Sequence, residues 1–407
     1  MNIESLSQPT SEMNHQTRGS NQSSMRAYNE RLVLSLVRRH GQLAKIKISR
    51  MTGLSAQTVS VIMRALEADG LLIKGEPVRG KVGQPSIPLS LNPDGAYFIG
   101  LKIGRRSSEL VLVDFLGTVR QKIVHTYPFP EPNNIEQFVT KGIIKLEKSL
   151  GSQVDKISGL GIAMPFELWN WAEEIGAPKA KMDAWKTYDI RTVLSENHPY
   201  PVYLQNDATA ACGAELAFGK NQNKRDFVYF YIGTFVGGGV VINGSLFSGR
   251  TGNAGALGSM LINDGKGHTC QLIDEASIVT FERLLQKLGI DPSPLWQSEE
   301  GWGKFDDKID LWLKKVSRGL AQAIISSASL LDLEATVIDG AFPPNIRNKI
   351  VKATHEALEE FDLQGIEKPA VIPGSLGPVA RALGGASLPL FDRYLVDQNA
   401  LLVHQAT

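Results

Sequence analysis

The order of the predicted secondary structure elements restricts the fold of this chain most strongly, because one series of elements occurs twice. Three successive strands, a helix, a strand and a second helix are expected between residues 97 and 218, and a similar series is expected between residues 227 and 391. Strands that alternate with helices are typical of α/β domains. The repetition therefore predicts a duplicated α/β unit with two lobes and a cleft between them.

The individual strands and helices follow from apolar runs and from the turn residues between them. The first unit is expected to contain the strands 97–103, 109–115 and 122–125, the helix 135–150, the strands 157–164 and 202–205, and the helix 206–218. The second unit is expected to contain a strand meander that begins with 227–232, helices at 273–288 and 308–331, the strand 335–339, the helix 345–361, the strand 370–372 and the helix 378–391. We assign both units to one domain, 93–407, with lobes of about 93–205 and 206–407.

A different pattern, two short helices joined by a turn, lies ahead of these units at residues 43–72. The first helix has apolar residues at roughly helical spacing, namely Leu43, Ile46, Ile48 and Met51. Gly53 breaks this period because glycine can adopt the backbone angles of a helix C-cap, and Ser55 suits the N-cap of a second helix, 56–68. The apolar face of the second helix consists of Val59, Ile62, Met63 and Leu66.

The exposed start of the second helix has short polar side chains, which can reach base edges when a helix enters the major groove of DNA. Residues 71–74 are expected to form a strand, and the basic, glycine-rich loop 75–88 resembles a wing that contacts DNA backbone or minor groove. We therefore assign residues 25–92 to a winged helix-turn-helix domain. The residues expected to contact DNA are Lys47, Ser55, Gln57, Thr58, Ser60 and Arg64, together with Arg79, Lys81 and Gln84 in the wing.

A helical hairpin that only packs against another part of the protein is the alternative for this stretch. The wing favours DNA binding, and so do the basic residues that precede the turn. These are Arg31, Arg38, Arg39, Lys45, Lys47 and Arg50. The expected partner is a double-stranded DNA operator, palindromic if the protein forms the expected homodimer or higher homo-oligomer.

Composition limits the remaining function classes. With 407 residues, of which 43% are hydrophobic, the chain is long enough for two or three domains with substantial cores. The formal net charge is only +1, but basic residues outnumber acidic ones between residues 25 and 81, which places polyanion binding in this part of the chain. Cys212 and Cys270 provide no disulfide framework, and no apolar run is long enough to span a bilayer. These features suit a cytoplasmic protein with a polar, disordered tail over residues 1–24.

Two segments of the α/β units carry candidate binding residues. Asn206 and Asp207 follow a predicted strand and begin a helix, where side chains can face a cleft, and a simple helix cap is the alternative for Asp207. The glycines at 233 and 237–239 are expected to form a turn whose backbone N–H groups can approach phosphate oxygens. A tight hairpin, however, needs glycine for backbone reasons alone.

These segments, LQNDATAACGAELAFG and YIGTFVGGGVVINGSLFSGRTGNAGALGSM, resemble the ROK family of repressors, open reading frames and sugar kinases. The resemblance covers roughly residues 96–390 and implies an actin-like, hexokinase-like (ribonuclease H-like) ATPase fold, while the preceding winged helix-turn-helix matches the regulator branch of the family. In the family's kinases the residue that matches Asp207 accepts the proton of the attacking sugar hydroxyl. The resemblance therefore implies that a sugar ligand is bound by Asn206, Asp207, Gly238 and Glu275.

The chain departs from the kinase pattern at three places. The family's Asp-x-Gly-Gly-Thr, which serves metal and phosphate, is replaced by Lys102-Ile103-Gly104-Arg105-Arg106, so that an ammonium group stands where Mg²⁺ would be held. The Glu-x-Gly-His that binds sugar and zinc is replaced by residues 256–259, which begin with Ala256 and end with Ser259. The zinc cluster is reduced to Cys270 with His268 nearby, which are too few ligands for a structural zinc site. We therefore expect neither Mg-ATP nor zinc as a cofactor.

The sequence thus predicts a transcriptional regulator, more specifically a repressor, whose ROK-like domain binds a sugar or sugar derivative and does not transfer phosphate. The ligand is expected to favour one closure of the cleft and so to change the spacing of paired DNA-binding units. Two alternatives stay open. The first is an active ATP-dependent sugar kinase with an accessory DNA-binding domain, favoured by Asp207 but opposed by Lys102, Ala256 and Ser259. The second is a DNA-binding scaffold with a vestigial cleft.

Overall fold

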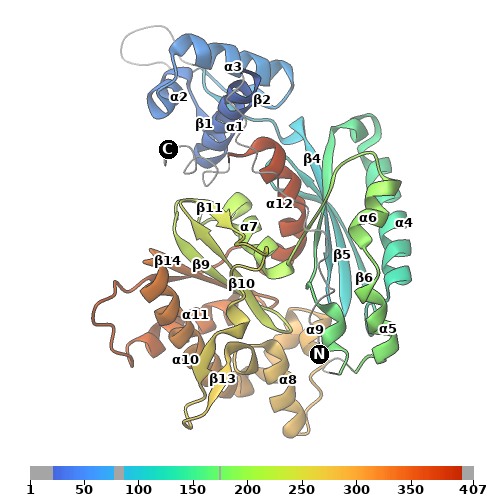
Figure 1. Ribbon diagram of the computed structural model, residues 1–407, viewed down its shortest axis with the longest axis vertical. Helices are drawn as coiled ribbons and strands as arrows, with labels where there is room; N and C mark the ends of the chain where they lie inside the picture. Colours follow the sequence, from blue (N-terminus) through green and yellow to red (C-terminus); the bar gives the residue numbers. More distant parts are fainter. Residues whose placement is uncertain (1–21, 78–86, 174–175, 397–407) are drawn as a thin grey trace, which may run out of the picture.

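The computed structural model describes residues 22–77, 87–173 and 176–396. A small helical head, formed by the N-terminal part of the chain, lies at one end of the molecule, and two larger α/β lobes follow it (Figure 1). The C-terminal helix returns to the head, so that both ends of the described chain lie near the same part of the molecule (Figure 1). None of the helices in these three ranges has both the length and the apolar character that crossing a bilayer would need.

The head has the secondary structure of a winged helix-turn-helix. It contains the helices α1 (Gln22–His40), α2 (Lys45–Thr52) and α3 (Ala56–Ala68) and the strands β1 (Gln42–Leu43), β2 (Leu72–Lys74) and β3 (Leu89–Leu91). The strands form a sheet in the order β1-β3-β2. Because α1 begins at Gln22, the expected tail over residues 1–24 is wrong for its last residues, and residues 1–21 lie outside the described ranges.

The turn between α2 and α3 is built as the sequence predicts. Gly53 has a left-handed backbone with φ of 72°, and the Ser55 side chain accepts a hydrogen bond from the Thr58 N–H at 3.0 Å as the N-cap of α3. The four apolar residues expected to form the buried face of α3 are all buried. Of the four apolar residues at helical spacing before this turn, Leu43 lies in β1, Ile48 is buried in α2, and Ile46 and Met51 are 62% and 42% exposed.

The first lobe is a five-stranded sheet in the order β6-β5-β4-β7-β8. Its strands are β4 (Tyr97–Ile103), β5 (Ser107–Asp114), β6 (Val119–Thr126), β7 (Ile157–Ala163) and β8 (Val202–Gln205). The helices α4 (Pro132–Leu150), α5 (Lys179–Asp183) and α6 (Ile190–Asn197) belong to the same lobe. Strand β4 is buried along its whole length, because it lies in the middle of the sheet with a neighbour on each side.

The second lobe repeats this strand order as β11-β10-β9-β14-β15. Its strands are β9 (Phe227–Ile232), β10 (Val236–Ile242), β11 (Ser245–Phe247), β14 (Ala335–Gly340) and β15 (Ala370–Pro373), with a separate hairpin of β12 (Leu261–Asn263) and β13 (Thr269–Gln271). The helices are α8 (Ile278–Lys287), α9 (Pro294–Gln297), α10 (Asp306–Leu331) and α11 (Pro344–Leu358). Both sheets place three antiparallel strands beside two parallel ones, which confirms the duplicated α/β fold.

Two helices, α7 (Asp207–Phe218) and α12 (Ala380–Tyr394), pack against each other between the sheets. Helix α7 contacts β10 of the second sheet, whereas α12 contacts β4 and β7 of the first sheet, although it comes last in the chain (Figure 1). A Cβ atom on Gly384 would lie only 2.3 Å from the Ala210 carbonyl carbon, so the two helices approach at backbone distance. A division into lobes of 93–205 and 206–407 therefore misplaces α12, which lies on the first sheet.

Candidate functional site

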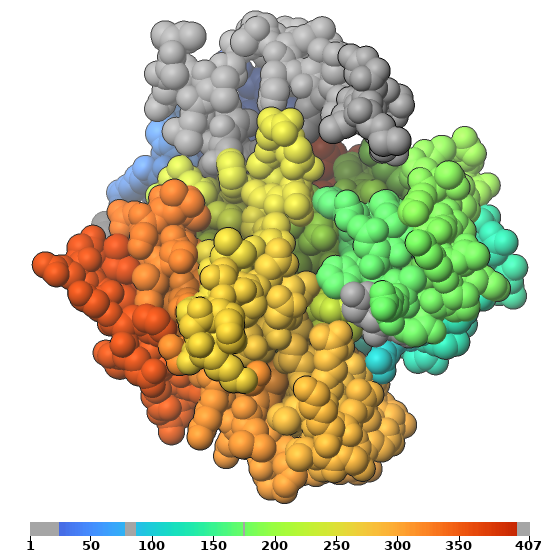
Figure 2. Space-filling view, turned by 60° about the horizontal axis from the view of Figure 1, so that its bottom comes forward, coloured from blue at the N-terminus to red at the C-terminus, as the bar shows by residue number. Residues whose placement is uncertain are grey.

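A cavity of about 490 Å³ lies between the two lobes, at the N-terminal ends of α7 and α12. Figure 2 shows a face of the molecule on which the first lobe, in green, and the second lobe, in yellow to orange, meet. The cavity is lined by the polar, aromatic and charged residues Arg105, Glu167, Asn170, Trp171, Asn206, Asp207, Phe235, Asn253, Ser259 and Arg381, and by small residues such as Gly238 and Ala256. Three of the four residues predicted to bind a ligand, Asn206, Asp207 and Gly238, are thus brought together at one cavity.

Asn206 and Asp207 take different parts at the start of α7. The Asn206 side-chain oxygen accepts hydrogen bonds from the N–H groups of Ala208 at 3.0 Å and Thr209 at 3.3 Å, so Asn206 is the helix cap. Asp207 is the first helical residue, and its Oδ2 accepts a hydrogen bond from Arg381 Nη1 at 3.1 Å. The Asp207 carboxylate therefore faces the cavity as one half of an ion pair that joins α7 to α12.

The position expected to disfavour Mg²⁺ is occupied by a buried ammonium group. Lys102, at the end of β4, is 4% exposed, and its Nζ lies 2.9 Å from Ser107 Oγ and 3.2 Å from Glu109 Oε1. The other Glu109 oxygen lies 2.7 Å from Lys122 Nζ. Burial lowers the pKa of Lys102 to about 8, and the positive charge of Arg381 acts in the same direction.

The same surroundings favour the charged form of Glu109. Burial alone raises the pKa of this carboxyl, but the ammonium groups of Lys102 and Lys122 outweigh it and bring the pKa down to about 2. Glu109 is thus ionised over the physiological range and is shared between two lysines. Glu109 in turn raises the pKa of Lys102, but burial and the positive charge of Arg381 outweigh this effect.

The turn between β4 and β5 reaches across to the second lobe through two arginines. Arg105 is 8% exposed, and its guanidinium carbon lies 4.6 Å from the Trp171 ring centroid and 4.1 Å from that of Phe235, which belongs to the second lobe. Arg106 forms an ion pair with Glu282 of α8 at 3.2 Å and lies over the Trp296 ring. The two arginines of this turn thus link the first lobe to the second.

A second cavity of about 300 Å³ lies on the other side of this turn. Its lining includes five basic residues, Lys102, Arg105, Arg106, Lys122 and Arg381, but only two acidic ones, Glu109 and Glu299. Arg105 and Arg381 line both cavities. The two guanidinium groups therefore lie at the junction of the larger and the smaller cavity.

The glycine run has a packing role that the expected turn does not describe. The turn between β9 and β10 comprises residues 233–235, and Gly237, Gly238 and Gly239 are part of β10. A Cβ atom on Gly237 would lie 2.8 Å from Ala208 Cβ, and one on Gly239 would lie 2.5 Å from Cys212 Cβ. A Cβ atom on Gly238 would lie 2.2 Å from the backbone carbonyl oxygen of Tyr229. These glycines allow α7 and β9 to approach β10 closely, and residues 237–239 belong to a strand and not to the expected turn.

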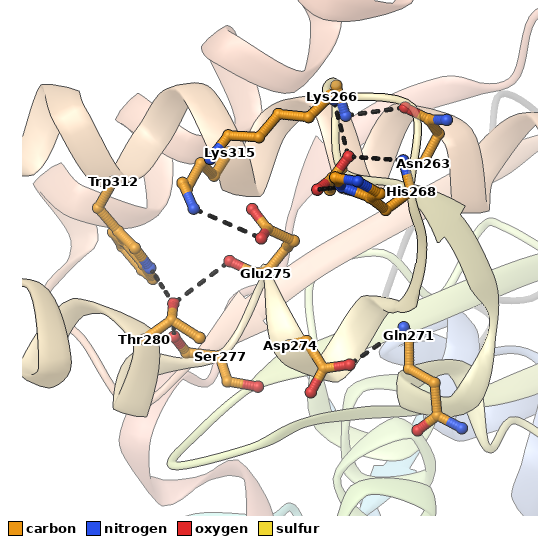
Figure 3. A network of polar contacts seen from close by, with 12 residues as sticks. Asn263, Lys266, His268, Gln271, Asp274, Glu275, Ser277, Thr280, Trp312 and Lys315 are labelled. Carbon is orange, nitrogen blue, oxygen red and sulfur yellow. Dashed lines mark hydrogen bonds and ion pairs between the residues drawn. The ribbon is translucent and has the colours of Figure 1, made fainter.

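Glu275 is not brought to the cavity wall described above. Its Oε1 lies 3.4 Å from Lys315 Nζ on α10, and its backbone oxygen accepts a hydrogen bond from Thr280 Oγ1 at 3.3 Å (Figure 3). The neighbouring Ile273 lines the cavity instead. The sequence placed Glu275 near a sugar-binding position of the family, but the local chain turns its carboxylate toward α10.

The residues predicted to be the remnant of a zinc site do not fit a metal. His268 has a 78% exposed side chain and lies 3.1 Å from Asp264 Oδ2, whereas Cys270 is half-buried on β13. Over residues 22–77, 87–173 and 176–396, no group of three or more His, Cys, Asp or Glu side chains is arranged to hold a metal ion.

The residues predicted to contact DNA lie on the head. Lys47, Ser55, Gln57 and Arg64 are exposed, and Thr58 and Ser60 are half-exposed on α3. Ser55 and Thr58 also bond to each other, with their hydroxyl oxygens 2.8 Å apart. Arg79, Lys81 and Gln84 lie outside the described residues.

Arg38 does not belong to the basic DNA-facing set. Its guanidinium donates to the Phe115 carbonyl oxygen and lies 5.4 Å and 5.7 Å from the ring centroids of Phe115 and Phe218. Removal from water lowers the pKa of Arg38 to about 10, although the Asp114 carboxylate opposes this shift. Arg38 therefore joins α1 of the head to the first lobe and to the end of α7.

Sequence reasoning missed Arg381 and did not assign Arg105 to the site as a binding residue. Arg105 was noticed only as a replacement for a small residue, and Arg381 lies in a helix that the sequence marks by its small residues. Asp207 and Arg381 are 174 positions apart, so no local spacing indicates their ion pair. The one local signal for this part of the site was the aromatic side chain of Trp171. Its ring centroid lies 3.9 Å from that of Phe235 in the cavity wall.

A winged helix-turn-helix head joined to a two-lobed α/β domain with a polar cavity defines a class of proteins that couple a DNA-binding unit to a small-molecule cavity. A model of the ROK family matches residues 98–390, and a model of winged helix-turn-helix DNA-binding domains matches residues 26–73. The chain belongs to the ROK family.

Three similar proteins place the chain beside both regulators and kinases. The xylose repressor of Bacillus spizizenii is 25% identical over 381 residues, which are 90% of this chain and 96% of that protein. A solved ROK family transcriptional regulator, described as a homologue of the E. coli MLC protein, has a TM-score of 0.66 at 18% identity and covers 94% of this chain and 98% of its own. The ROK hexokinase of Thermus thermophilus has a TM-score of 0.53 at 22% identity over 71% of this chain and 97% of its own.

Proposed function

We propose that this protein is a sugar-responsive transcriptional repressor. The observation that carries the proposal is the combination of a winged helix-turn-helix head with an interlobe cavity lined by Asn206 and Asp207. The similarity to a xylose repressor over 96% of that protein supports the same arrangement of domains in this chain. In this proposal α3 enters the major groove, with Gln57, Thr58, Ser60 and Arg64 at base edges and Lys47 at the phosphate backbone.

The helix pair α7 and α12 provides a route from cavity to head. Both helices begin at the cavity, where Asp207 pairs with Arg381. At their other ends, Phe218 of α7 lies beside Arg38 of α1, and α12 contacts α1 directly. A ligand that alters the Asp207–Arg381 pair therefore acts on two helices that both reach the head.

We further propose that the ROK domain binds its ligand without transferring phosphate. An ammonium group at Lys102 opposes binding of Mg²⁺ at the end of β4. The Asp207 carboxylate, which would have to accept a proton from the sugar, is held by the Arg381 guanidinium. Neither Mg-ATP nor zinc is part of this proposal, and the half-buried Cys270 beside an exposed His268 offers zinc no closed set of four ligands.

DNA binding and its response to sugar test the main proposal together. Genome-wide mapping of bound sites gives the operator. Fluorescence anisotropy with that fragment then gives its affinity with and without the sugars on which the products of the neighbouring genes act. We expect xylose or another sugar of those operons to lower operator affinity at least tenfold. Full-length protein that binds no mapped fragment more tightly than random DNA would contradict the proposal.

An active sugar kinase is the second candidate, because Asp207 lies at the cavity and the ROK hexokinase shares the fold. A coupled assay for ADP release, run with Mg-ATP and a panel of hexoses and pentoses, separates the two. We expect no sugar-dependent turnover above that of an Asp207→Asn variant. Turnover that Asp207→Asn abolishes would establish the kinase.

A further inference from the structure

The contact of Arg106 with the second lobe brings together side chains from three parts of the fold. Arg106 lies in the turn after β4, and its Nη2 is 3.2 Å from Oε1 of Glu282 on α8. The indole N–H of Trp296 on α9 donates a hydrogen bond to the same carboxylate oxygen, and the Arg106 guanidinium carbon lies 5.1 Å from the Trp296 ring centroid. Arg106 of the first lobe thus contacts a carboxylate and a ring that are already joined to each other in the second lobe.

The Glu282 carboxylate needs this contact because it is withdrawn from water. Its side chain is 7% exposed, whereas that of Arg106 is 44% exposed. Burial raises the pKa of Glu282, and the charge of Arg106, the Trp296 N–H and the charge of Arg283 oppose this shift. Moving the lobes apart would take Arg106 away and leave a buried carboxylate with less compensation, which costs free energy. The buried charge therefore favours the arrangement in which the lobes touch.

The contact lies far from the helices that connect the lobes. Figure 1 shows α9 beside the first lobe, farther from the head than α7 and α12, which pack against each other between the two sheets. A motion of the lobes that pivots at this helix pair displaces the end remote from the head most. A contact at that end is therefore the one that such a motion must break.

The contact is also separate from the larger cavity. Among the residues that the structure describes, those lining that cavity include neither Arg106 nor Glu282 nor Trp296, while Arg106 and Trp296 line the smaller one. A substitution at Arg106 or Glu282 therefore changes the contact between the lobes without removing a side chain from the cavity that contains Asn206 and Asp207.

The head follows the first lobe rather than the second. Buried apolar residues of the head and of the first sheet belong to one hydrophobic core, which includes Val33 and Leu34 of α1, Phe98 of β4 and Val113 of β5. Residues that share a close-packed core move together. A change in the angle between the lobes therefore moves the head relative to the second lobe.

We propose that Arg106, Glu282 and Trp296 form an interlobe latch, which holds the lobes together at the end remote from the head and thereby sets where the head lies relative to the second lobe. The consequence for DNA binding rests on the proposed function, whereas the holding of the lobes does not. The latch stabilises one of the arrangements between which the lobes can move.

Distances between the lobes of the full-length protein test the latch without DNA or sugar. Spin labels are attached to cysteines introduced by Lys145→Cys on α4 and Lys352→Cys on α11, both exposed positions. Cys270→Ser removes the half-buried thiol, and the remaining Cys212 is buried. We expect Arg106→Gln and Glu282→Arg each to shift the distance distribution, measured by electron–electron double resonance, toward longer distances.

A charge exchange and a matched control distinguish the latch from a general loss of charge. Arg106→Glu combined with Glu282→Arg restores an ion pair with reversed polarity, and is expected to return the distances toward those of wild type. Lys368→Gln removes an ion pair with Glu359 inside the second lobe and is expected to leave the distances unchanged. Arg106→Gln, at an exposed turn residue, carries the test if Glu282→Arg does not fold. A wild-type distribution in Arg106→Gln, or an equal shift in Lys368→Gln, would overturn the latch.

Operator binding in the absence of sugar tests the consequence for the head. We expect Arg106→Gln to change the affinity for a mapped operator by about threefold or more, and the charge exchange to reverse this change. Shifted distances with unchanged affinity would overturn the control of the head by the latch. Absence of specific DNA binding by the wild type would remove the repressor instead, while the distances would still decide whether the latch exists.

Discussion

At the scale of single residues, the lowered pKa of Lys102 gives a stability effect with a definite sign. The folded protein releases the Lys102 proton near pH 8 and the unfolded chain near 10.5, because burial disfavours the charged form. Between these values the unfolded chain binds more protons, so the free energy of unfolding rises with pH, whereas below pH 8 the cost of burial is present in full. Relative to Lys102→Met, wild type should gain about 2 kcal/mol between pH 8 and pH 10.

Urea unfolding of both proteins at several pH values measures this difference. Groups that titrate in both proteins cancel when the two free energies are subtracted. Parallel pH profiles would show that Lys102 keeps its ordinary pKa.

Gln57 allows base reading by α3 to be separated from backbone contact. It is exposed near the start of α3 and, unlike Thr58, does not support the Ser55 cap. We expect Gln57→Ala to weaken operator binding about 5- to 100-fold and to leave binding to random DNA unchanged. Lys47→Ala is the comparison, expected to weaken both and to reduce the salt dependence. Anisotropy titrations at several salt concentrations distinguish the two, and equal losses on all DNA would exclude Gln57 from base reading.

At the scale of elements, the sequence predicted most strands and helices because each produces a local signal. The strands β4, β8 and β9 are largely apolar runs, and the bounds predicted for them agree with the structure. The buried face of α3 follows from its period of 3.6 residues. The contact of α12 with β4 and β7 of the first sheet gives no such signal, because it depends on residues more than two hundred positions away.

The same distinction explains which parts of the site were predicted. Asn206 and Asp207 were found because a strand end followed by a helix start leaves a local pattern. Arg38 was misassigned because its sequence neighbours are basic, and only the packing of Phe115 and Phe218 around it reveals a role at the interface. The apolar spacing before Gly53 did not show which residues are buried, because α2 is too short for its spacing to fix one buried face.

Arg38 connects the elements that join the head to the cavity, which gives a prediction for signalling. Arg38→Met keeps much of the side-chain volume but removes the guanidinium from Phe115 and Phe218. We expect the variant to bind operator within a few-fold of wild type, because Arg38 is not on the DNA-facing surface, and to lose most of the ligand-induced change in affinity. Anisotropy titrations with and without effector measure both quantities. An unchanged response would exclude Arg38 from the route.

At the scale of the whole molecule, the proposed control acts on the spacing of two heads in a dimer. Helix-turn-helix dimers bind half-sites about 34–36 Å apart, so a change in head spacing weakens binding only when both half-sites are engaged. Effector should therefore lower the affinity for a complete operator strongly and for a single half-site hardly at all. Titrations of both fragments, with sedimentation to establish the oligomer, test this. If half-site binding falls equally, the ligand acts within each head, and the contacts of Arg38 with α7 become the site of control rather than the dimer.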